Sequence, residues 1–552
     1  MRIPLVLYGL AFIVRSALML VYPDPAYADS FYYVNVARAL ASGHGLNVDF
    51  VWIFAEVGGR LPLDPTLPIP SNAHWLPLAS FIQAPFVAVM GPTAIASALP
   101  MVLIGSLAAP LTWLIARDIG ASRMVQLGAG VLAAIPAAGA VFMAQPENFA
   151  IFQPLVAATL WFAARGLRGD KRAYIAAGFL VGLASLARND AFLLGAAVGL
   201  VFFIDRVRAW RRGTRPALPL AAAVGCVALY LVVVVPWWYR QYMVFGSISP
   251  TASTGTALWL TAYRQWNSIT ADTTLAAFLA QGWGAIIGSR LIGLGAALAN
   301  FVVVISSVVL VPFIVRGGWL RRRSDDLLPW FLYTATLFLG ATFLFPLHVP
   351  GGAFVHSAVG LGPHAYILAL EGVAAFVVAI AKRRPAWRPE VATPVFTWAI
   401  VGLVVVSAAI WAPVVHASWN KDRVPRTALA AELDRIGVPV TDRLMTIDAG
   451  GFKYFSGRPG VVSPDDPIDT IADVARAYDI RWLVLERTGV VAALEPVLAG
   501  GPRPAWIGPA VFSIVAGDAG PPILVLFPVC TTASDTRCTA PATLTTNVGA
   551  GS

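Results

Sequence analysis

Stretches of about 20 apolar residues recur through the first three-quarters of this 552-residue chain. Each is long enough to cross, as a helix, a hydrocarbon core about 30 Å thick. Only 12% of the residues are charged, compared with about 25% in a soluble domain, and 58% are hydrophobic. These features exclude a chain of ordinary soluble domains and an intrinsically disordered chain. They predict a polytopic α-helical membrane protein.

The apolar runs predict about eleven transmembrane helices within a membrane domain over residues 1–416. The first begins at residue 3 and has no small-residue cleavage site, so we expect it to be retained as an anchor. The pair at 173–204 is short enough to be re-entrant or strongly tilted. The predicted spans are 3–21, 92–116, 124–143, 148–164, 173–187, 190–204, 217–236, 291–315, 327–346, 362–381 and 394–415.

The distribution of Lys and Arg predicts the orientation of these spans. One set of connecting loops contains twenty of these residues and the opposite set contains six. The bias predicts a cytoplasmic N-terminus and an extracytoplasmic C-terminal segment in the plasma membrane. The net charge of +10 is then a topology signal with attraction to anionic lipid heads, so we expect no nucleic-acid partner.

The predicted outer loops at 22–91 and 237–290 are long, whereas the inner loops are short and basic. The chain has no GxxxxGK[ST] motif to bind a nucleotide. We therefore expect the protein to act at the outer face of the membrane without ATP.

Residues 417–540 have the composition of a small soluble domain, which we expect in the extracytoplasmic space. The patterns predict buried strands at Leu444–Ile447, Trp482–Glu486 and Ile523–Val529, and helices at Thr427–Ile436 and Asp469–Tyr478. This alternation is typical of an α/β module. Cys530 and Cys538 lie on the oxidising side, where a disulfide can form. Residues 541–552 have the composition of a disordered tail.

Directly after the first span, residues 27–43 predict a helix beside the membrane. Asp29 or Ser30 can cap it, and Gly43 can end it. The Asp29 carboxylate would then lie at the positive end of a helix dipole. An ordinary capping aspartate is the alternative interpretation. An apolar stripe indicates a helix that lies against an apolar surface, and its members are Tyr33, Val36, Ala37 and Leu40.

Further charged and polar residues recur at the predicted outer ends of the spans. They are Glu147 in Gln145-Pro-Glu-Asn148, Arg188 and Asp190 in Leu186-Ala-Arg-Asn-Asp, Arg240 after Trp237-Trp-Tyr, and His348 and His356. Charged groups near a bilayer boundary are costly unless they are paired or hydrated. Their recurrence on one side is consistent with a shared polar cavity.

Each of these residues also has a simpler interpretation. Glu147 can cap the fourth span, Arg188 can pair only with Asp190, and Arg240 can be an interfacial anchor in an aromatic belt. His348 and His356 lack carboxylate neighbours and ligand spacing along the chain, which argues against a zinc site.

Two more positions stay open in the same way. His74 precedes an apolar run, so it lines the acceptor side or marks an interfacial helix. Arg15 lies in the middle of the first span, where it either faces a cavity or snorkels to the interface.

Taken together, these motifs resemble the GT-C superfamily of integral-membrane glycosyltransferases that use polyprenyl-phosphate sugars. The likeness is greatest to the bacterial protein O-mannosyltransferases and aminoarabinose transferases. It rests on the Asp29/Tyr32/Tyr33/Ala37/Leu40/Gly43 string, Pro146-Glu147, Leu186-Ala-Arg-Asn-Asp190, Pro236-Trp-Trp-Tyr-Arg240 with Phe245-Gly246, Met445-Thr-Ile-Asp-Ala449 with Tyr454-Phe-Ser-Gly-Arg458, and Tyr478-Asp-Ile-Arg-Trp-Leu-Val484. The family often has Arg-Pro-Glu where this chain has Arg188-Asn-Asp, and two adjacent acids where Asp29 is followed by Ser30.

The resemblance implies transfer of a sugar from a polyprenyl-phosphate donor to an acceptor hydroxyl, with inversion and with Asp29 as general base. Arg188 and Arg240 are the candidates for the donor phosphate, because a guanidinium binds phosphate with two matched hydrogen bonds. Substrate-binding candidates are Glu147, Asp190, His356, His348 and His74. We expect no dedicated metal ligands and leave a divalent cation open. The implied partners are the lipid-linked donor, membrane lipid and a glycan, lipid or protein acceptor.

Two other functional classes fit a polytopic chain. One is a secondary transporter or lipid flippase, although we detect no repeat of the first half in the second. The other is a non-catalytic protein of cell-envelope assembly whose external module binds partners.

Overall fold

The computed structural model describes residues 2–253, 258–344, 353–384, 386–517, 520–531, 535–539 and 544–549. The chain divides into two compact units. The first, called the helical unit below, comprises Met1–Asp24, Trp75–Pro250 and Gln281–Val415. The second, the α/β unit, comprises Pro25–His74, Thr251–Ala280 and His416–Ser552.

Within the described residues, seven helical segments are long and apolar enough to cross a membrane. They are α1 (Arg2–Val21), α4 with α5 (Ala94–Gly105 and Ala108–Asp118), α7 (Phe149–Leu167), α10 (Leu220–Phe245), α13 with η6 (Gly282–Asn300 and Phe301–Ile305), Phe354–Ala381, which includes α17 (Gly362–Ala381), and α18 (Pro389–Arg435). Three shorter apolar segments are α3 (Leu78–Met90), α6 (Arg123–Ala134) and Leu328–Leu344, which includes α15 (Leu328–Leu339). The predicted polytopic helical fold is confirmed, and the number of eleven spans stays a prediction.

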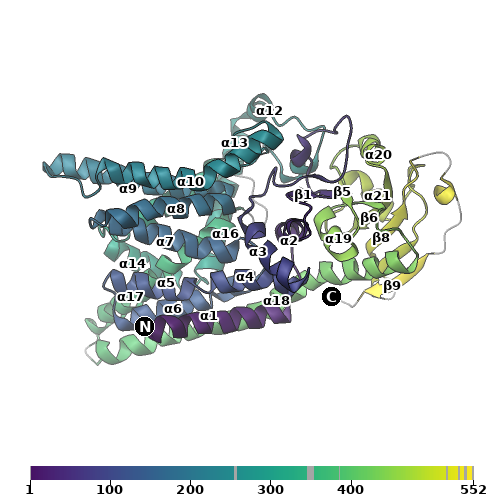
Figure 1. Ribbon diagram of the computed structural model, residues 1–552. Helices are drawn as coiled ribbons and strands as arrows, with labels where there is room; N and C mark the ends of the chain where they lie inside the picture. Colours follow the sequence, from purple (N-terminus) through teal and green to yellow (C-terminus); the bar gives the residue numbers. More distant parts are fainter. Residues whose placement is uncertain are drawn as a thin grey trace. The chain divides into compact units, whose positions relative to one another are not determined.

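Small residues let the helices of this unit approach closely. Helices α8 (Lys171–Ala187) and α10 lie side by side (Figure 1), and a Cβ on Gly178 would overlap the carbonyl group of Cys226. The same holds where α14 (Val311–Arg321) meets α17, because Gly317 lies against the main chain of Leu368. Such contacts replace the hydrophobic effect, which does not drive helix association in lipid. Cys226 is buried at this crossing, as expected for a small apolar residue.

The α/β unit contains a seven-stranded sheet with the order β2-β5-β4-β6-β8-β7-β9. Its strands are β2 (Phe50–Val51), β4 (Arg443–Thr446), β5 (Gly460–Val462), β6 (Ile480–Glu486), β7 (Phe512–Ala516), β8 (Pro522–Pro528) and β9 (Thr545–Gly549). The β2-β5-β4-β6 pairings are parallel and β8 runs antiparallel to its neighbours. The three predicted strands are present as β4, β6 and β8. The predicted helices are the C-terminal end of α18 and α20 (Ile468–Ala477).

Residues 25–74, most of the first predicted outer loop, are part of this α/β unit. Their strand β2 pairs with β5, and their helix α2 (Ala28–Ala41) packs against α19 (Ala449–Ser456). The side-chain amide of Asn35 donates a 2.8 Å hydrogen bond to the carbonyl oxygen of Gly450. Residues 25–74 and 251–280 thus share a compact unit with residues 416–552. The domain boundary at residue 416 stays a prediction.

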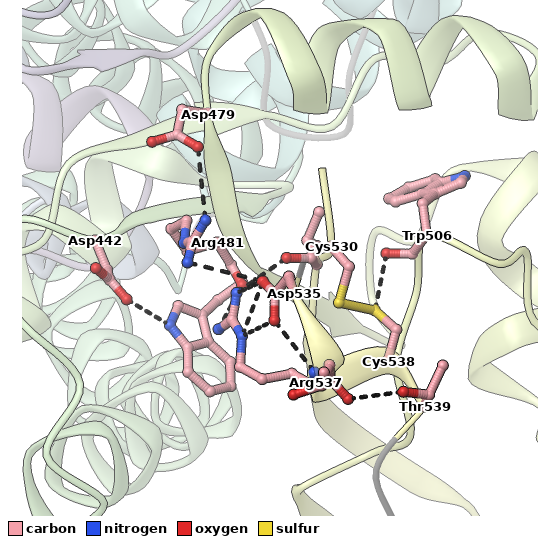
Figure 2. A network of polar contacts seen from close by, with 12 residues as sticks. Asp442, Asp479, Arg481, Trp506, Cys530, Asp535, Arg537, Cys538 and Thr539 are labelled. Atoms are coloured by element: carbon pink, nitrogen blue, oxygen red, sulfur yellow. Dashed lines mark hydrogen bonds and ion pairs between the residues drawn. A yellow bond between two sulfur atoms is a disulfide. The ribbon is translucent and has the colours of Figure 1, made fainter. Parts of the chain in front are cut away.

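The C-terminal segment differs from the sequence-based expectation. Residues 545–549 form β9, which pairs in parallel with β7, so the prediction of a disordered tail is wrong for these residues. Strand pairing uses main-chain groups, which a composition rich in Thr, Ala and Gly does not reveal. Cys530 and Cys538 form a disulfide. Figure 2 shows it next to Asp535, whose carboxylate pairs with Arg537 and Arg481.

Candidate functional site

Three segments of the helical unit meet in a polar cluster. They are the N-terminus of α7, the turn between α8 and α9 (Phe192–Arg212), and the short helix α16 (Ala353–Ala358). Helix α8 ends because Arg188 takes an extended backbone conformation, and a single 3₁₀ turn at Asn189–Ala191 leads into α9. The Asn148 amide joins two of the segments through a 2.8 Å hydrogen bond to the carbonyl oxygen of Ala187.

The Glu147 carboxylate is fully buried and has two partners in this cluster. One oxygen accepts a 2.9 Å hydrogen bond from the main-chain N–H of Phe149, at the start of α7. The other lies 3.1 Å from Nδ1 of His356, and the Phe149 ring stacks on the imidazole with centroids 4.1 Å apart. Asn148 is the N-cap residue of α7, and Glu147 just before it binds the first helical N–H and also reaches a second candidate residue. The expectation that His356 lacks a carboxylate neighbour is wrong, because the fold joins residues 209 positions apart.

Arg188, Asp190 and Ser357 form the second part of the cluster. The Nε atom of Arg188 donates to Asp190 at 3.0 Å and to the Ser357 hydroxyl at 2.8 Å. That hydroxyl donates in turn to the other oxygen of Asp190. The expected Arg188–Asp190 pair is thus present, with each side chain 13% exposed. Ser357 was missed, because a lone serine next to a histidine carries no signal in the sequence.

The two parts are linked through α16, which supplies both His356 and Ser357. An arginine, two carboxylates, an imidazole and a hydroxyl are therefore held where the ends of several helices meet. In such a low-dielectric position, hydrogen bonds to charged groups are stronger than in water. The cluster can orient a guanidinium for an anion and move a proton between carboxylate and imidazole.

Asp29 lies in the α/β unit, in the first turn of α2. Tyr27 is the N-cap residue, and the Ser30 hydroxyl accepts the hydrogen bond of its main-chain N–H at 3.2 Å. Asp29 is therefore not the capping residue, but its half-buried carboxylate lies at the positive end of the helix. Burial and the negative charge of Asp29 raise the pKa of Tyr263 to about 12. The helix ends at Ala41 with Gly43 at φ 82°, as predicted.

The remaining candidates lie in different surroundings. Arg240 on α10 lies over the rings of Trp237 and Phe245, 5.2 Å from each centroid, as the anchor interpretation expects. His74 belongs to the α/β unit, where Nδ1 lies 2.8 Å from the Ser253 hydroxyl and burial lowers the pKa of the imidazole to about 4. His348 lies outside the described residues.

Arg15 faces the interior of the helical unit, where it is 1% exposed, and does not snorkel. Its Nη2 atom lies 3.4 Å from the carbonyl oxygen of Ala133 and 3.5 Å from Oε1 of Gln153. The absence of Cβ at Gly105 makes room for this guanidinium.

Comparisons with known proteins agree with this architecture. Residues 71–239 match the family model of dolichyl-phosphate-mannose-protein mannosyltransferases. No curated protein matches the sequence at a significant level. The fold is similar to that of ArnT from Cupriavidus metallidurans bound to undecaprenyl phosphate, with a TM-score of 0.53 and 14% identity over 96% of this chain and 98% of that chain. For ArnT in the apo state the TM-score is 0.50 and the identity 14%, over 94% and 98% of the two chains.

The resemblance to GT-C membrane glycosyltransferases is therefore confirmed at the level of the fold and of a family model. The chain is a multi-pass membrane protein with an ArnT-like fold along nearly its whole length, and its residues 71–239 are similar to dolichyl-phosphate-mannose-protein mannosyltransferases.

Proposed function

We propose that the chain is a glycosyltransferase that moves a sugar from a polyprenyl-phosphate donor to an acceptor hydroxyl at the outer face of the plasma membrane. The observation that carries the proposal is the largely buried cluster of Arg188, Asp190, Ser357, Glu147 and His356 within a helical unit of ArnT-like fold. Ionisable groups inside a membrane bundle are costly, and those that are retained mark substrate pathways. The ArnT relative holds undecaprenyl phosphate, which supports a polyprenyl phosphate as the lipid carrier here.

The reaction is a single displacement at the anomeric carbon. The acceptor oxygen forms a bond to that carbon while the bond to the phosphate oxygen breaks, so the configuration inverts. The acceptor proton passes to the Asp29 carboxylate, and the electron pair leaves with the polyprenyl phosphate. The helix dipole at α2 favours the ionised carboxylate that a base requires. A positioned base contributes about 10²–10⁴-fold in rate.

Arg188 is the primary candidate for the leaving phosphate. Asp190 and Ser357 hold the Nε edge of its guanidinium, so its orientation is set before a ligand arrives. We assign Arg240 to the same phosphate and Glu147, Asp190, His356, His348 and His74 to substrate binding. Glu147 orients His356 through the 3.1 Å contact, which makes the pair suited to hydrogen bonding with a sugar or phosphate. Whether the transfer requires a divalent cation is tested by adding a chelator to the assay.

The test uses the purified full chain in liposomes. Radiolabelled polyprenyl-phosphate sugars are supplied in turn together with envelope extract, and transfer of label to the acceptor is measured. Wild type should transfer label from at least one donor. Asp29→Asn should transfer it about 10²–10⁴-fold more slowly, because the base is lost.

Asp64→Asn is the matched control, since Asp64 is an exposed acid in the same outer loop. It should transfer label at the wild-type rate. Unchanged transfer by Asp29→Asn contradicts the assignment of the base. Substrate flux across the liposome that needs no lipid-linked donor contradicts the enzyme itself and favours a transporter.

A further inference from the structure

Three aromatic rings from separate segments of the α/β unit form a row. The imidazole of His74 contacts the indoles of both Trp52 and Trp266, with centroids 6.0 Å and 5.0 Å away. All three residues are half-buried. Trp52 follows β2, His74 ends the first outer loop, and Trp266 belongs to the 3₁₀ helix η5 (Tyr263–Asn267) of the second outer loop.

The segment that carries Trp266 is held firmly within the α/β unit. Asp466 accepts hydrogen bonds from the main-chain N–H groups of Ile269 and Thr270, at 2.8 Å and 3.2 Å, and from the Ser268 hydroxyl at 2.6 Å. Arg264 pairs with Asp465 at 3.6 Å. These contacts fix the position of the Trp266 ring before a ligand binds. A ring that is already in place lowers the entropic cost of binding.

The row lies in the same unit as the proposed base. Tyr263, one turn of η5 before Trp266, lies within electrostatic reach of Asp29, whose charge raises the pKa of the phenol. The 3₁₀ helix that carries Trp266 therefore also carries a residue within electrostatic reach of the proposed base.

Burial disfavours the charged forms of the polar groups next to the rings. His74 is neutral, because burial lowers its pKa to about 4. Glu56, whose carboxylate accepts a 3.0 Å hydrogen bond from the main-chain N–H of Trp52, has a pKa raised to about 7 by burial. A hydrogen bond with the Tyr32 side chain partly opposes this shift. The 3₁₀ helix of Glu56, η1 (Phe54–Val57), packs against η5.

We propose that Trp52, His74 and Trp266 form a carbohydrate-binding subsite that takes an uncharged pyranose or furanose ring. A sugar ring presents a flat face of C–H groups that stacks on indole, and hydroxyls at its edge that hydrogen-bond to neutral polar groups. Amphipathic aromatic side chains suit such ligands, which are apolar on one face and wet at the edge. The inference rests on the proposed function, because the bound sugar ring would belong to one of the two substrates of the transfer, the acceptor or the donor.

The binding test uses the full chain in detergent and saturation-transfer NMR. The probes are methyl α-D-mannopyranoside and methyl α-D-arabinofuranoside, and mannitol is the matched polyol without a ring. Ring protons of at least one glycoside should receive saturation from wild type, and mannitol should receive little. Trp266→Ala and Trp52→Ala should each raise the Kd about tenfold, which corresponds to ~1.4 kcal/mol.

Two controls separate stacking from general damage. Trp266→Phe keeps a ring and should bind within about threefold of wild type. Trp283→Ala removes an indole that is 74% exposed in the helical unit and should bind like wild type. Absence of glycoside binding by wild type, or equal binding by wild type and both alanine variants, overturns the subsite.

A kinetic arm identifies the source of the ring and separates the two proposals. A higher KM of Trp266→Ala for the acceptor assigns the ring to the acceptor, and a higher KM for the lipid-linked sugar assigns it to the donor. Asp29→Asn should still bind the glycoside although it transfers sugar about 10²–10⁴-fold more slowly. Glycoside binding without transfer by wild type refutes the proposed function alone, whereas transfer whose KM values do not change in Trp266→Ala refutes the subsite alone.

Discussion

Each unit of the molecule contains an arginine among carboxylates, and the two clusters differ in what holds the guanidinium. In the helical unit, Arg188 has one carboxylate, Asp190, and one hydroxyl, Ser357, around its Nε atom. In the α/β unit, Arg426 donates to both oxygens of Glu486, at 2.9 Å and 3.0 Å, and also to Asp448. Arg188 is thus held by a carboxylate together with a hydroxyl, whereas all three nitrogens of Arg426 donate to carboxylates.

The partners of Arg426 belong to different elements that the ion pairs hold together. Arg426 lies on α18, Glu486 ends β6, and Asp448 caps α19 by accepting a 2.9 Å hydrogen bond from the main-chain N–H of Gly451. Burial raises the pKa of Glu486, and the Arg426 charge opposes this shift. The cluster at Arg426 is therefore built for stability. The cluster at Arg188 joins helix ends at the proposed ligand-binding site. The stabilising role thus belongs to the α/β unit and the proposed ligand-binding role to the helical unit.

The largest expected effect is the loss of stability in Arg426→Gln. The substitution leaves Asp448 and Glu486 buried without their cation, which costs about 3–5 kcal/mol. Thermal unfolding of the full chain in detergent should show a clearly lower midpoint. Arg476→Gln is the matched control, because its pair with Asp473 is exposed and worth less than about 1 kcal/mol. Equal midpoints for the two variants would contradict the structural role.

The buried acid Glu56 gives the second test, because it lies outside the Arg426 cluster. The pKa of Glu56 is raised from 4.5 to about 7, mainly by burial. The folded protein binds this proton more tightly than the unfolded chain, so the resulting stability is full below pH about 4.5 and is lost as the pH rises through 7. Glu56→Gln should therefore stabilise the protein by about 3 kcal/mol at pH 8 and by much less at pH 5.

The measurement for Glu56→Gln is thermal unfolding between pH 5 and pH 9. The exposed acid Asp64 supplies the control, since Asp64→Asn should give a curve parallel to that of wild type. Parallel curves for Glu56→Gln and wild type would show that Glu56 does not titrate in this range.

The disulfide of the α/β unit extends the comparison to a covalent link. Cys530 and Cys538 are eight residues apart, so replacing both with Ser should cost about 2–3 kcal/mol through the greater entropy of the unfolded chain. The double variant should unfold at a lower temperature and keep the wild-type rate of sugar transfer, because the link lies outside the proposed site. A matched loss of transfer, measured well below the unfolding midpoint, would show that this part of the α/β unit takes part in function.

The sequence predicted those features that depend on local patterns. Apolar runs located the membrane helices, alternation located β4, β6 and β8, and Gly43 marked the end of α2. Features that depend on long-range pairing were missed. The two-residue strand β2 is too short to carry a pattern, and Glu147 meets His356 only because α7 and α16 pack together. The same limit hid Ser357 and the row of Trp52, His74 and Trp266, whose members come from separate loops.

The smallest expected change is also the most specific test of the difference between the arginines. Arg188→Lys keeps the positive charge at Asp190 but loses the planar fork that binds a phosphate with two hydrogen bonds. Sugar transfer should fall by about tenfold or more, the equivalent of ~1.4 kcal/mol, while the thermal midpoint changes little. Arg426→Lys should do the reverse, because its fork binds Glu486 and not a ligand. If both lysine variants lowered only the midpoint, Arg188 would be a structural residue like Arg426, and the phosphate would have to be bound elsewhere.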